Sequence, residues 1–450
     1  MADIICAIAT APATAALGII RISGDGVLDL LLPMLKKKSG APARLEHAKA
    51  TLCRIEDQGE IFDEAMVTFF EGPRSFTGED TAELCCHGGL YVLQSVMELL
   101  LRKGCRMAEP GEFSKRAFLN GKLDLIRAQA VIDLIEATSR AEQKNALSQL
   151  EGHLSRRITA LYERLVELNT ALLAYVDFPE EVDAPEEDTL QELRAIEEEL
   201  SALLAGSNQG RLIKEGLQIA IVGAPNVGKS TLMNRLLGYD RSIVSSIPGT
   251  TRDTVTEGCR LGDLKCHIAD TAGIRTTADP IEQQGIDIAR RRAEEASVVF
   301  AVFDGSRPLS EEDQALAEEF GNGRNLAIIN KADLPQMADT EYIQSKFIHC
   351  VKISAQNGAG CAVLDQWVRE QFSPVDQTAE GMLTSLSQAR RLLAGQQAVR
   401  RAIEGLEAGF TPDLASLDIT EAASAVGEVT GDTVTEKMID NIFSKFCVGK

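Results

Sequence analysis

Residues 223–230 read Gly-Ala-Pro-Asn-Val-Gly-Lys-Ser and directly follow the apolar run at 217–222. Glycines in such a loop let the backbone turn tightly, so that its N–H groups can point at phosphate oxygens. Lys229 can place a positive charge on the outer phosphates, and Ser230 can ligate Mg²⁺. The pattern predicts a phosphate-binding loop between a buried strand and a helix, with a nucleoside triphosphate and a divalent metal as its ligands.

Two motifs further along the chain indicate the base, and each follows a short apolar run. Asn330-Lys331-Ala332-Asp333 comes after residues 326–329, and Asp333 can accept hydrogen bonds from both N1–H and the 2-amino group of guanine. Adenine lacks that pair of donors and would leave the buried carboxylate unpaired. Ser354-Ala355-Gln356 comes after residues 351–353 and fits a backbone contact to guanine O6. The motifs favour GTP over ATP.

Two segments between these motifs could sense the outer phosphate. Asp270-Thr271-Ala272-Gly273 offers Asp270 to the outer shell of Mg²⁺ and the Gly273 N–H to the γ-phosphate, and Thr251 in a candidate switch segment at 249–253 could complete the metal shell. Each motif alone is weak, but five in this order beside suitable strands disfavour ordinary turns. The expected nucleotide contacts are Asn226, Val227, Gly228, Lys229, Ser230, Thr231, Ser245, Ser246, Ile247, Pro248, Gly249, Thr250, Thr251, Asp270, Thr271, Ala272, Gly273, Asn330, Lys331, Ala332, Asp333, Ser354, Ala355 and Gln356.

The residue that would orient the attacking water in a Ras-like enzyme is missing. Ras-like enzymes carry a glutamine after the Asp-x-x-Gly motif, whereas this chain has Ile274. The side-chain oxygen of Asn226 could instead hold a monovalent cation, such as K⁺, where charge builds between the β- and γ-phosphates. The alternative is that Asn226 only shapes the loop. Further oxygen ligands for the cation could come from Ser245, Ile247 and Thr250.

Three other side chains are candidates for a part in hydrolysis. Arg252 and Arg275 are rival stabilisers of the transition-state charge. Glu282 could position the water, or it could be a solvated glutamate at the start of a helix, where the helix dipole favours an acid. The sequence leaves both interpretations of Glu282 open.

Composition limits the classes of protein that fit. A length of 450 residues allows two to four domains, and 44% hydrophobic residues can bury several cores. A formal charge of −21 argues against a protein that coats nucleic acid nonspecifically, so any contact with RNA needs a local patch or a partner's surface. A poor signal-peptide pattern and no apolar run of transmembrane length favour a cytoplasmic protein with no membrane partner.

In a chain of this length, the ten cysteines indicate reduced thiols rather than a metal site. None forms a Cys-x-x-Cys pair, so zinc is not expected. Cys85-Cys86-His87 is ligand-like in composition, but adjacent residues on a strand point to opposite faces, which favours packing, with His87 near a functional pocket as the alternative. Cys447 is a candidate nucleophile, although a buried cysteine packed beside Phe443 and Phe446 is the favoured alternative.

The pattern along the chain predicts a multidomain α/β plus α protein. We expect a small α+β domain at 1–118, a helical segment at 119–213, an α/β nucleotide domain with a mostly parallel sheet at 214–370, and a second helical segment at 371–450. Helical spacing occurs at 90–102, 128–151, 154–173, 190–204, 386–407 and from 419, with a linker expected at 206–210. We infer that the two helical segments pack together, so that the nucleotide domain is an insertion between them.

The motifs together resemble those of the MnmE (TrmE) tRNA-modification GTPases. The resemblance includes Gly-x-Pro-Asn-x-Gly-Lys-Ser, Gly-Thr-Thr-Arg-Asp, Asp-Thr-Ala-Gly-Ile and a Glu-x-x-Gly-Ile stretch. The end of the chain, Cys-Val-Gly-Lys, is similar to that family's Cys-Ile-Gly-Lys terminus. Residues 18–24, 75–80 and 119–125 fit as well, so the resemblance spans essentially the whole chain.

The resemblance implies a complete activity and its partners. Members hydrolyse GTP with K⁺ and Mg²⁺, and two GTPase domains approach each other across a homodimer. With an FAD-containing MnmG (GidA)-type partner, in a heterotetramer, they install a (carboxymethyl)aminomethyl group at C5 of the wobble uridine (position 34) of certain tRNAs. The one-carbon unit comes from a tetrahydrofolate, as 5-formyl- or methylene-tetrahydrofolate. The N-terminal domain resembles folate-binding domains and supplies the dimer interface.

The resemblance also implies a folate site, whose contacts map to Arg21, Glu79, Lys122 and Lys450. The alternative is that Arg21 and Glu79 form surface ion pairs.

Two other functions stay open at this point. A ribosome-assembly GTPase of the Era or EngA type would carry a basic RNA-binding module, but residues 371–450 hold seven Lys or Arg against eleven Asp or Glu. A stand-alone folate enzyme with a regulatory nucleotide domain is the other alternative.

Overall fold

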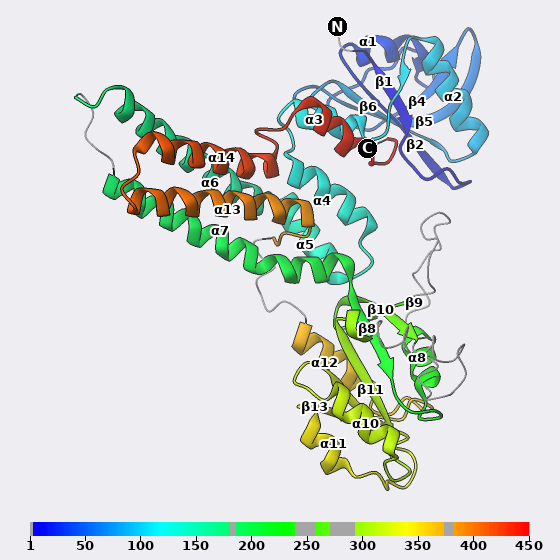
Figure 1. The fold of residues 1–450 in the computed structure, drawn as a ribbon. Helices are drawn as coiled ribbons and strands as arrows, with labels where there is room; N and C mark the ends of the chain where they lie inside the picture. The colour runs from blue at the N-terminus through cyan, green and yellow to red at the C-terminus, as the bar shows by residue number, and fades with distance from the viewer. Residues whose placement is uncertain (1–2, 181–185, 239–256, 271–292, 373–380, 450) are drawn as a thin grey trace, which may run out of the picture. The chain divides into compact units, whose positions relative to one another are not determined.

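The computed structural model describes residues 3–180, 186–238, 257–270, 293–372 and 381–449 (Figure 1). The chain forms two compact units. Unit 1 comprises residues 1–132, 155–178 and 416–450, and unit 2 comprises residues 133–154 and 179–415. Each unit therefore joins segments that lie far apart in sequence. Among the helices of these described stretches, none combines the length and apolar character that a bilayer span requires.

Unit 1 is built on a seven-stranded sheet in the order β3-β4-β5-β6-β2-β1-β7. The neighbouring strands are antiparallel except β1 and β7, which are parallel. Helix α2 (Leu90–Arg102) packs its apolar side on one face of the sheet, where the core of the domain lies (Figure 1). The strands are β1 (Ile5–Ile8), β2 (Leu17–Ser23), β3 (Leu35–Lys36), β4 (Thr51–Asp57), β5 (Glu60–Phe70), β6 (Thr81–His87) and β7 (Arg106–Met107).

The alternation of side chains on β6 decides the interpretation of the Cys85-Cys86-His87 run. Cys86 is fully buried, while Cys85 is half-buried and His87 is exposed. The imidazole Nδ1 of His87 lies 2.6 Å from a carboxylate oxygen of Asp63. The three side chains therefore do not share one environment: packing is confirmed for Cys86, whereas His87 lies at the surface.

Helices from both ends of the chain complete unit 1. Helix α15 (Glu436–Phe443) packs on α3 (Glu112–Leu119) around a cluster of buried side chains. Gly111, just before α3, has φ +69°, and a Cβ there would lie 2.2 Å from the carbonyl oxygen of Phe443. This glycine therefore permits the close approach of the two helices. The other helices with residues in unit 1 are α1 (Val27–Leu31), the 3-10 helix η1 (Leu32–Met34), α4 (Leu125–Glu136), α6 (His153–Asp177) and α14 (Pro412–Thr430).

Unit 2 contains a six-stranded sheet in the order β13-β12-β11-β8-β10-β9. All neighbours are parallel except β9 and β10. Every residue of β11 is buried, as expected for a central strand covered on both faces. The strands are β8 (Leu217–Val222), β9 (Glu257–Leu261), β10 (Leu264–Asp270), β11 (Val298–Asp304), β12 (Leu326–Asn330) and β13 (His349–Lys352), and the helices described within 217–372 are α8 (Lys229–Gly238), α10 (Glu311–Phe320), α11 (Thr340–Lys346) and α12 (Ala362–Phe372).

Helices from before and after this sheet pack together within unit 2. Helix α7 (Glu186–Glu215) lies beside α13 (Leu386–Glu407), as Figure 1 shows. Arg400 of α13 forms an ion pair of 2.6 Å with Glu197 of α7. Near the start of α13, the Met382 carbonyl accepts a hydrogen bond from Gln149 of α5 (Arg140–Leu150). The nucleotide sheet is therefore an insertion between helices that contact each other.

One sequence expectation about these helices was wrong. Residues 206–210 are not a linker, because α7 continues through them to Glu215. A Cβ at Gly210 would lie 1.9 Å from the carbonyl oxygen of Leu383, so this glycine serves a close contact rather than a break. The helical stretch at 128–151 is two helices, because Ser139 and Glu142 form a capping box that starts α5. The predicted domain boundaries stay predictions.

We expect Gly111→Ala to lower the free energy of unfolding by about 3 kcal/mol, because it combines left-handed backbone strain with a clash against the Phe443 carbonyl. Urea unfolding of the full chain followed by circular dichroism measures it. Gly121→Ala is the matched control, since Gly121 has φ +67° and open space around its Cβ position. The control should cost about 1 kcal/mol. Equal costs for the two variants would contradict the role of Gly111 in packing.

Candidate functional site

The phosphate loop connects β8 to α8 in unit 2 as the sequence predicts. Asn226 has φ +65° and Gly228 has φ +102°, so the loop turns through the left-handed region twice. The Nζ of Lys229 donates hydrogen bonds to the Gly223 and Ala224 carbonyls, at 2.8 and 2.9 Å. Ser230 and Thr231 are exposed in the first turn of α8. The N-terminus of α8, which begins at Lys229, can therefore bind an anion such as phosphate.

The buried amide of Asn330 connects this loop to the two base motifs. Its Nδ2 donates to the Val227 carbonyl at 2.8 Å, and its Oδ1 accepts from the Ala355 N–H at 2.9 Å. A Cβ at residue 228 would lie 2.2 Å from the same Nδ2, so only glycine fits there. One side chain thus holds the loops that follow β8, β12 and β13 at one edge of the sheet. Ligands of parallel sheets bind at that carboxyl-terminal edge.

The other residues of the base motifs lie together at this edge. The Ala332 N–H donates to the Ile353 carbonyl at 3.0 Å, and Ser354 is fully buried. Arg235 of α8 donates to the carbonyls of Ala355 and Gln356. Asp333 is exposed. The structure therefore leaves the Asp333 carboxylate accessible to a ligand.

Asp304 at the end of β11 is a part of the site that the motifs did not indicate. Its carboxylate accepts from the Nζ of Lys331 at 2.6 Å and from the Ser306 hydroxyl at 2.6 Å. Burial alone would raise the pKa of Asp304, but the hydrogen bonds from Lys331 and Ser306 hold the pKa below its usual range. The carboxylate therefore stays charged and fixes Lys331, whose φ is +63°. The position of Asp304, directly after an apolar strand, is the signal that could have identified it.

Part of the predicted site lies outside the described residues. The backbone of Asp270 ends β10, and nothing is described of its side chain. The other predicted site residues outside the described part of the chain are Ser245, Ser246, Ile247, Pro248, Gly249, Thr250, Thr251, Arg252, Thr271, Ala272, Gly273, Arg275, Glu282 and Lys450.

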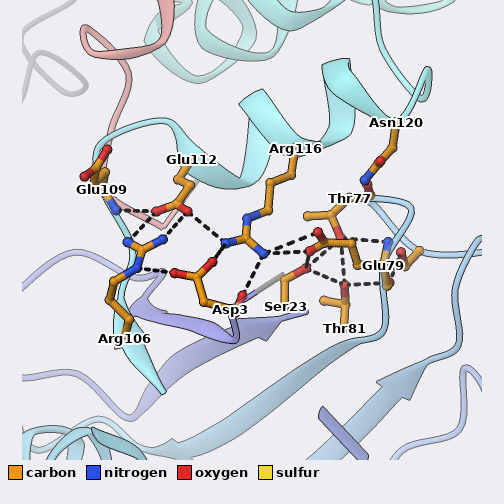
Figure 2. Close-up of polar contacts among 11 residues, drawn as sticks. Asp3, Ser23, Thr77, Glu79, Thr81, Arg106, Glu109, Glu112, Arg116 and Asn120 are labelled. Carbon is orange, nitrogen blue, oxygen red and sulfur yellow. Dashed lines mark hydrogen bonds and ion pairs between the residues drawn. The ribbon is translucent and has the colours of Figure 1, made fainter. Parts of the chain in front are cut away.

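A network of charged side chains extends from Arg106 through Asp3, Glu112 and Arg116 to Glu79 in unit 1 (Figure 2). The Arg116 guanidinium of α3 donates to Asp3, Glu79 and Glu112, at 2.8, 3.1 and 2.9 Å. Arg106 of β7 contacts Asp3 and Glu112 but not Glu79. The side chains of Arg116, Glu79 and Glu112 are only 11%, 14% and 12% exposed, so these charges are largely removed from water. Arg116 therefore connects Glu79 to the rest of the network.

The charges of this network stabilise each other's ionised forms. Burial alone would raise the pKa of Glu112, but hydrogen bonds from Arg106, the Glu109 N–H and Arg116 keep the pKa below its ordinary value. Arg106 similarly lowers the pKa of Asp3. Depressed carboxyl pKa values contribute stability above the unfolded pKa, and that stability is lost as the pH falls. Unit 1 therefore loses these contributions under acidic conditions.

Hydroxyl groups hold the other side of the Glu79 carboxylate. The Ser23 hydroxyl donates to Glu79 at 2.9 Å and lies 2.7 Å from the Thr77 hydroxyl. Asn120, just after α3, donates to the Thr77 carbonyl at 2.8 Å, and Lys122 donates to the Pro73 carbonyl at 2.9 Å. The loop that carries Glu79 is therefore fixed by both the sheet and α3.

Arg21 and Glu79 each form an ion pair, with Glu83 and Arg116 respectively, so the alternative of ion pairs at these two residues stays open. The Arg21 guanidinium binds Glu83 at 2.8 Å and donates to the Gly449 carbonyl at 3.1 Å. The rings of Phe76 and Phe113 lie 5.7 and 5.9 Å from the guanidinium carbon. Arg21 thus attaches the C-terminal segment to the sheet that carries the proposed folate residues.

The surroundings of Cys447 differ from the favoured expectation. Phe443 and Phe446 are buried, but Cys447 is exposed. Its carbonyl accepts a hydrogen bond from the Gly111 N–H at 3.3 Å, which turns the backbone at this point. The expectation of a buried cysteine was wrong, because the two phenylalanines fill the cluster between α3 and α15. The role of the thiol stays a prediction.

We expect Asn330→Ala to lower the affinity for GTP at least about tenfold, because it leaves the Val227 carbonyl and the Ala355 N–H without their partner. Titration of the full chain with a fluorescent GTP analogue measures this. Asn325→Ala is the control: Asn325 is equally buried and connects the Val299 N–H to the Phe320 carbonyl. The control should lose stability but keep its GTP affinity. A similar loss of affinity in both variants would contradict a specific role for Asn330.

Comparisons with known proteins agree with this geometry. The family description "GTP-binding protein TrmE N-terminus" matches residues 4–122, and "MnmE helical domain" matches residues 125–447. A protein of Thermotoga maritima named tRNA modification GTPase MnmE is 40% identical, with 100% of both chains covered. Proteins of the same name from Aquifex aeolicus and Acetivibrio thermocellus are 38% and 37% identical, with all of this chain and at least 99% of theirs covered.

Among solved structures, a variant of Aquifex aeolicus Era bound to GDP and aluminium fluoride covers 40% of this chain and 66% of its own, at 28% identity and a TM-score of 0.28. The full-length relatives and the matched family descriptions are sufficient: this chain belongs to the MnmE (TrmE) family of tRNA modification GTPases.

Proposed function

We propose that this chain binds and hydrolyses GTP and couples hydrolysis to the modification of tRNA. The observation that carries the proposal is the amide of Asn330, which brings the phosphate loop and both base motifs to one sheet edge. The relatives that cover the whole chain are named for the same activity. Because the resemblance extends over the full length, a ribosome-assembly GTPase of the Era or EngA type is the weaker alternative.

The described residues account for binding more fully than for hydrolysis. The first turn of α8 and the Lys229 ammonium would hold the β- and γ-phosphates, and Asp333 would select guanine. Mg²⁺ prefers hard oxygen ligands, and the exposed Ser230 hydroxyl fits that preference, with Thr251 proposed as a second ligand. The bound metal neutralises charge on the phosphates. Lys229 adds a fixed positive charge at the same place.

A monovalent cation is proposed as the additional charge stabiliser. Asn226 is exposed and has a left-handed backbone conformation, so its amide is accessible to a ligand. With Ser245, Ile247 and Thr250 it would hold K⁺ next to the bridging oxygen of the phosphates. Glu282 would position water in place of the missing glutamine, and Arg252 and Arg275 are the competing stabilisers.

Replacing K⁺ with Na⁺ at equal ionic strength should slow GTP turnover roughly 100-fold, the scale of losing one preorganised stabiliser of transition-state charge. Steady-state phosphate release measures the rate, and GTP affinity in each salt shows whether binding is unchanged. Asn226→Ala should remove the difference between the two salts. If wild-type turnover were the same in both salts, Arg252 or Arg275 would have to supply the charge.

We further propose that unit 1 binds a tetrahydrofolate through Arg21, Glu79, Lys122 and Lys450 and forms the homodimer interface. The Glu79 carboxylate suits the amino edge of a pterin, because Arg116 and Ser23 hold it in place as an acceptor. Arg21 would bind a folate carboxylate in addition to its existing contacts with Glu83 and the Gly449 carbonyl. The folate would supply a one-carbon unit to the C5 position of the wobble uridine, with Cys447 as a candidate participant.

Glu79→Gln should weaken binding of 5-formyl-tetrahydrofolate to the full chain by about tenfold to hundredfold, since hydrogen bonds to a charged acceptor are the strong ones. Isothermal titration calorimetry gives the dissociation constants. Glu112→Gln serves as the control, because Glu112 contacts the same arginine but belongs to no proposed folate contact. Unchanged affinity in Glu79→Gln would remove this carboxylate from the site.

An FAD-containing partner of the MnmG type is proposed to supply redox chemistry, in a cytoplasmic heterotetramer. The chain carries no obvious flavin-binding motif of its own, which supports the need for such a partner. Together the two proteins would install the (carboxymethyl)aminomethyl group on certain tRNAs.

The decisive test is nucleoside analysis of tRNA from cells that lack this chain. The modified wobble uridine should disappear and should return with the wild-type gene. Asp333→Asn should not restore it, because an asparagine amide favours xanthine over guanine, and the purified variant should prefer XTP to GTP. Unchanged nucleosides in the deleted strain would refute the proposed function.

A further inference from the structure

A turn at the edge of the unit 1 sheet concentrates positive charge in an acidic protein. Residues 36–54 contain six Lys or Arg and one Asp or Glu, in a chain whose formal charge is −21. Four of these cations, Lys36, Lys37, Lys38 and Arg44, lie on residues 36–44, which we call the basic turn. The last three are exposed. The basic turn is therefore a local reversal of the overall charge.

The backbone of the basic turn is fixed by hydrogen bonds. The Gly40 N–H donates to the Lys37 carbonyl at 2.8 Å, and the Lys37 N–H donates to the Ala41 carbonyl at 2.7 Å. Gly40 has φ +82°, a conformation in which glycine carries no penalty. At the base of the turn, Leu35 and Ala43 are buried in the core. The cations therefore project from a structured element.

These four cations differ from others in unit 1 in their pairing. Arg21, Arg54, Arg106 and Arg116 each form an ion pair. None of Lys36, Lys37, Lys38 and Arg44 forms an ion pair with any residue that the structure describes.

The nearby acids are already engaged by other cations. Glu46 pairs with Lys49 at 3.1 Å, and Glu64 pairs with Arg54 at 2.7 Å. The charges of the basic turn are therefore not compensated by local ion pairs.

Stability alone does not explain this arrangement. Lys36 lies directly opposite Arg54 in the pairing of β3 with β4, and like charges in opposite positions are destabilising. Lysine on an edge strand can prevent sheets from joining, and β3 is such an edge. Protection of the sheet edge accounts for Lys36. Strand β3 ends at Lys36, however, and Lys37, Lys38 and Arg44 lie beyond the strand.

We propose that the basic turn is a tRNA-binding surface that contacts backbone phosphates. This inference rests on the proposed function in tRNA modification and identifies where an acidic chain meets its RNA. Lysine binds phosphate as a point charge, without demanding a fixed geometry. Residues 36–44 contain no aromatic side chain on which a base could stack. The contact therefore adds affinity for every tRNA and does not select among them.

The test compares two triple variants of the full chain that lower the net charge equally. Lys37→Gln/Lys38→Gln/Arg44→Gln removes the exposed cations of the basic turn. Lys49→Gln/Arg74→Gln/Lys103→Gln removes three cations of the same domain that are each held in an ion pair. Fluorescence anisotropy with labelled unfractionated tRNA, over a range of KCl concentrations, gives the affinity and its salt dependence.

The first variant should bind tRNA at least about tenfold more weakly at low salt. The slope of log K against log[salt] should fall by about 2 to 3, since each phosphate contact contributes about 0.7 to 0.9. The loss should be the same for tRNAs with and without the target uridine, and GTP turnover without tRNA should not change. The second variant should resemble the wild type.

Several results would overturn the proposal. Equal losses in the two variants would show that only net charge matters, and no loss in the first would exclude the basic turn. If the first variant kept its tRNA affinity but no longer bound the FAD-containing partner, the surface would be a protein interface. The nucleoside analysis of the deleted strain tests the proposed function separately. If it confirms the tRNA modification while one of the results above is obtained, only the role of the basic turn is refuted.

Discussion

The site at the edge of the unit 2 sheet depends on one buried amide. Asn330 offers a donor and an acceptor in opposite directions, and each finds a backbone partner in a different loop. A buried amide with one bond missing would be costly, so the three loops are held together or not at all. Gly228 is required by the same contact, because any side chain there would occupy the space of the amide. The relative positions of the loops that carry the phosphate and base motifs therefore depend on this single residue.

Much of unit 2 could be predicted because its strands are continuous apolar runs. The run at 217–222 is β8, and the run at 326–329 lies within β12. A parallel sheet buries both faces, so such runs have a clear signal, and motifs placed after them must lie at the same edge. Asp304 was missed because a lone aspartate after a strand resembles any turn residue.

Glycines and phenylalanines were harder to interpret. Gly206 and Gly210 have the composition of a linker, yet both lie inside a continuous helix, and at Gly210 the close approach of the Leu383 carbonyl makes glycine necessary. Cys447 was expected to be buried because its neighbours are aromatic, but those neighbours fill the space between α3 and α15 and leave the thiol outside. In both cases a long-range contact reversed the local preference. The network of Arg116 was unpredictable for the same reason, since it joins residues from Asp3 to Glu112 that share no sequence pattern.

The contact between α7 and α13 has a consequence for how the chain is made. Helix α7 is synthesised before the whole nucleotide sheet, and its partner α13 only after it. At typical rates of translation this separates the two helices by on the order of ten seconds. During that interval the apolar residues of α7 that α13 later covers must be shielded by other means. A chain that ended after residue 372 would therefore leave uncovered the face of α7 that contacts α13 in the complete structure.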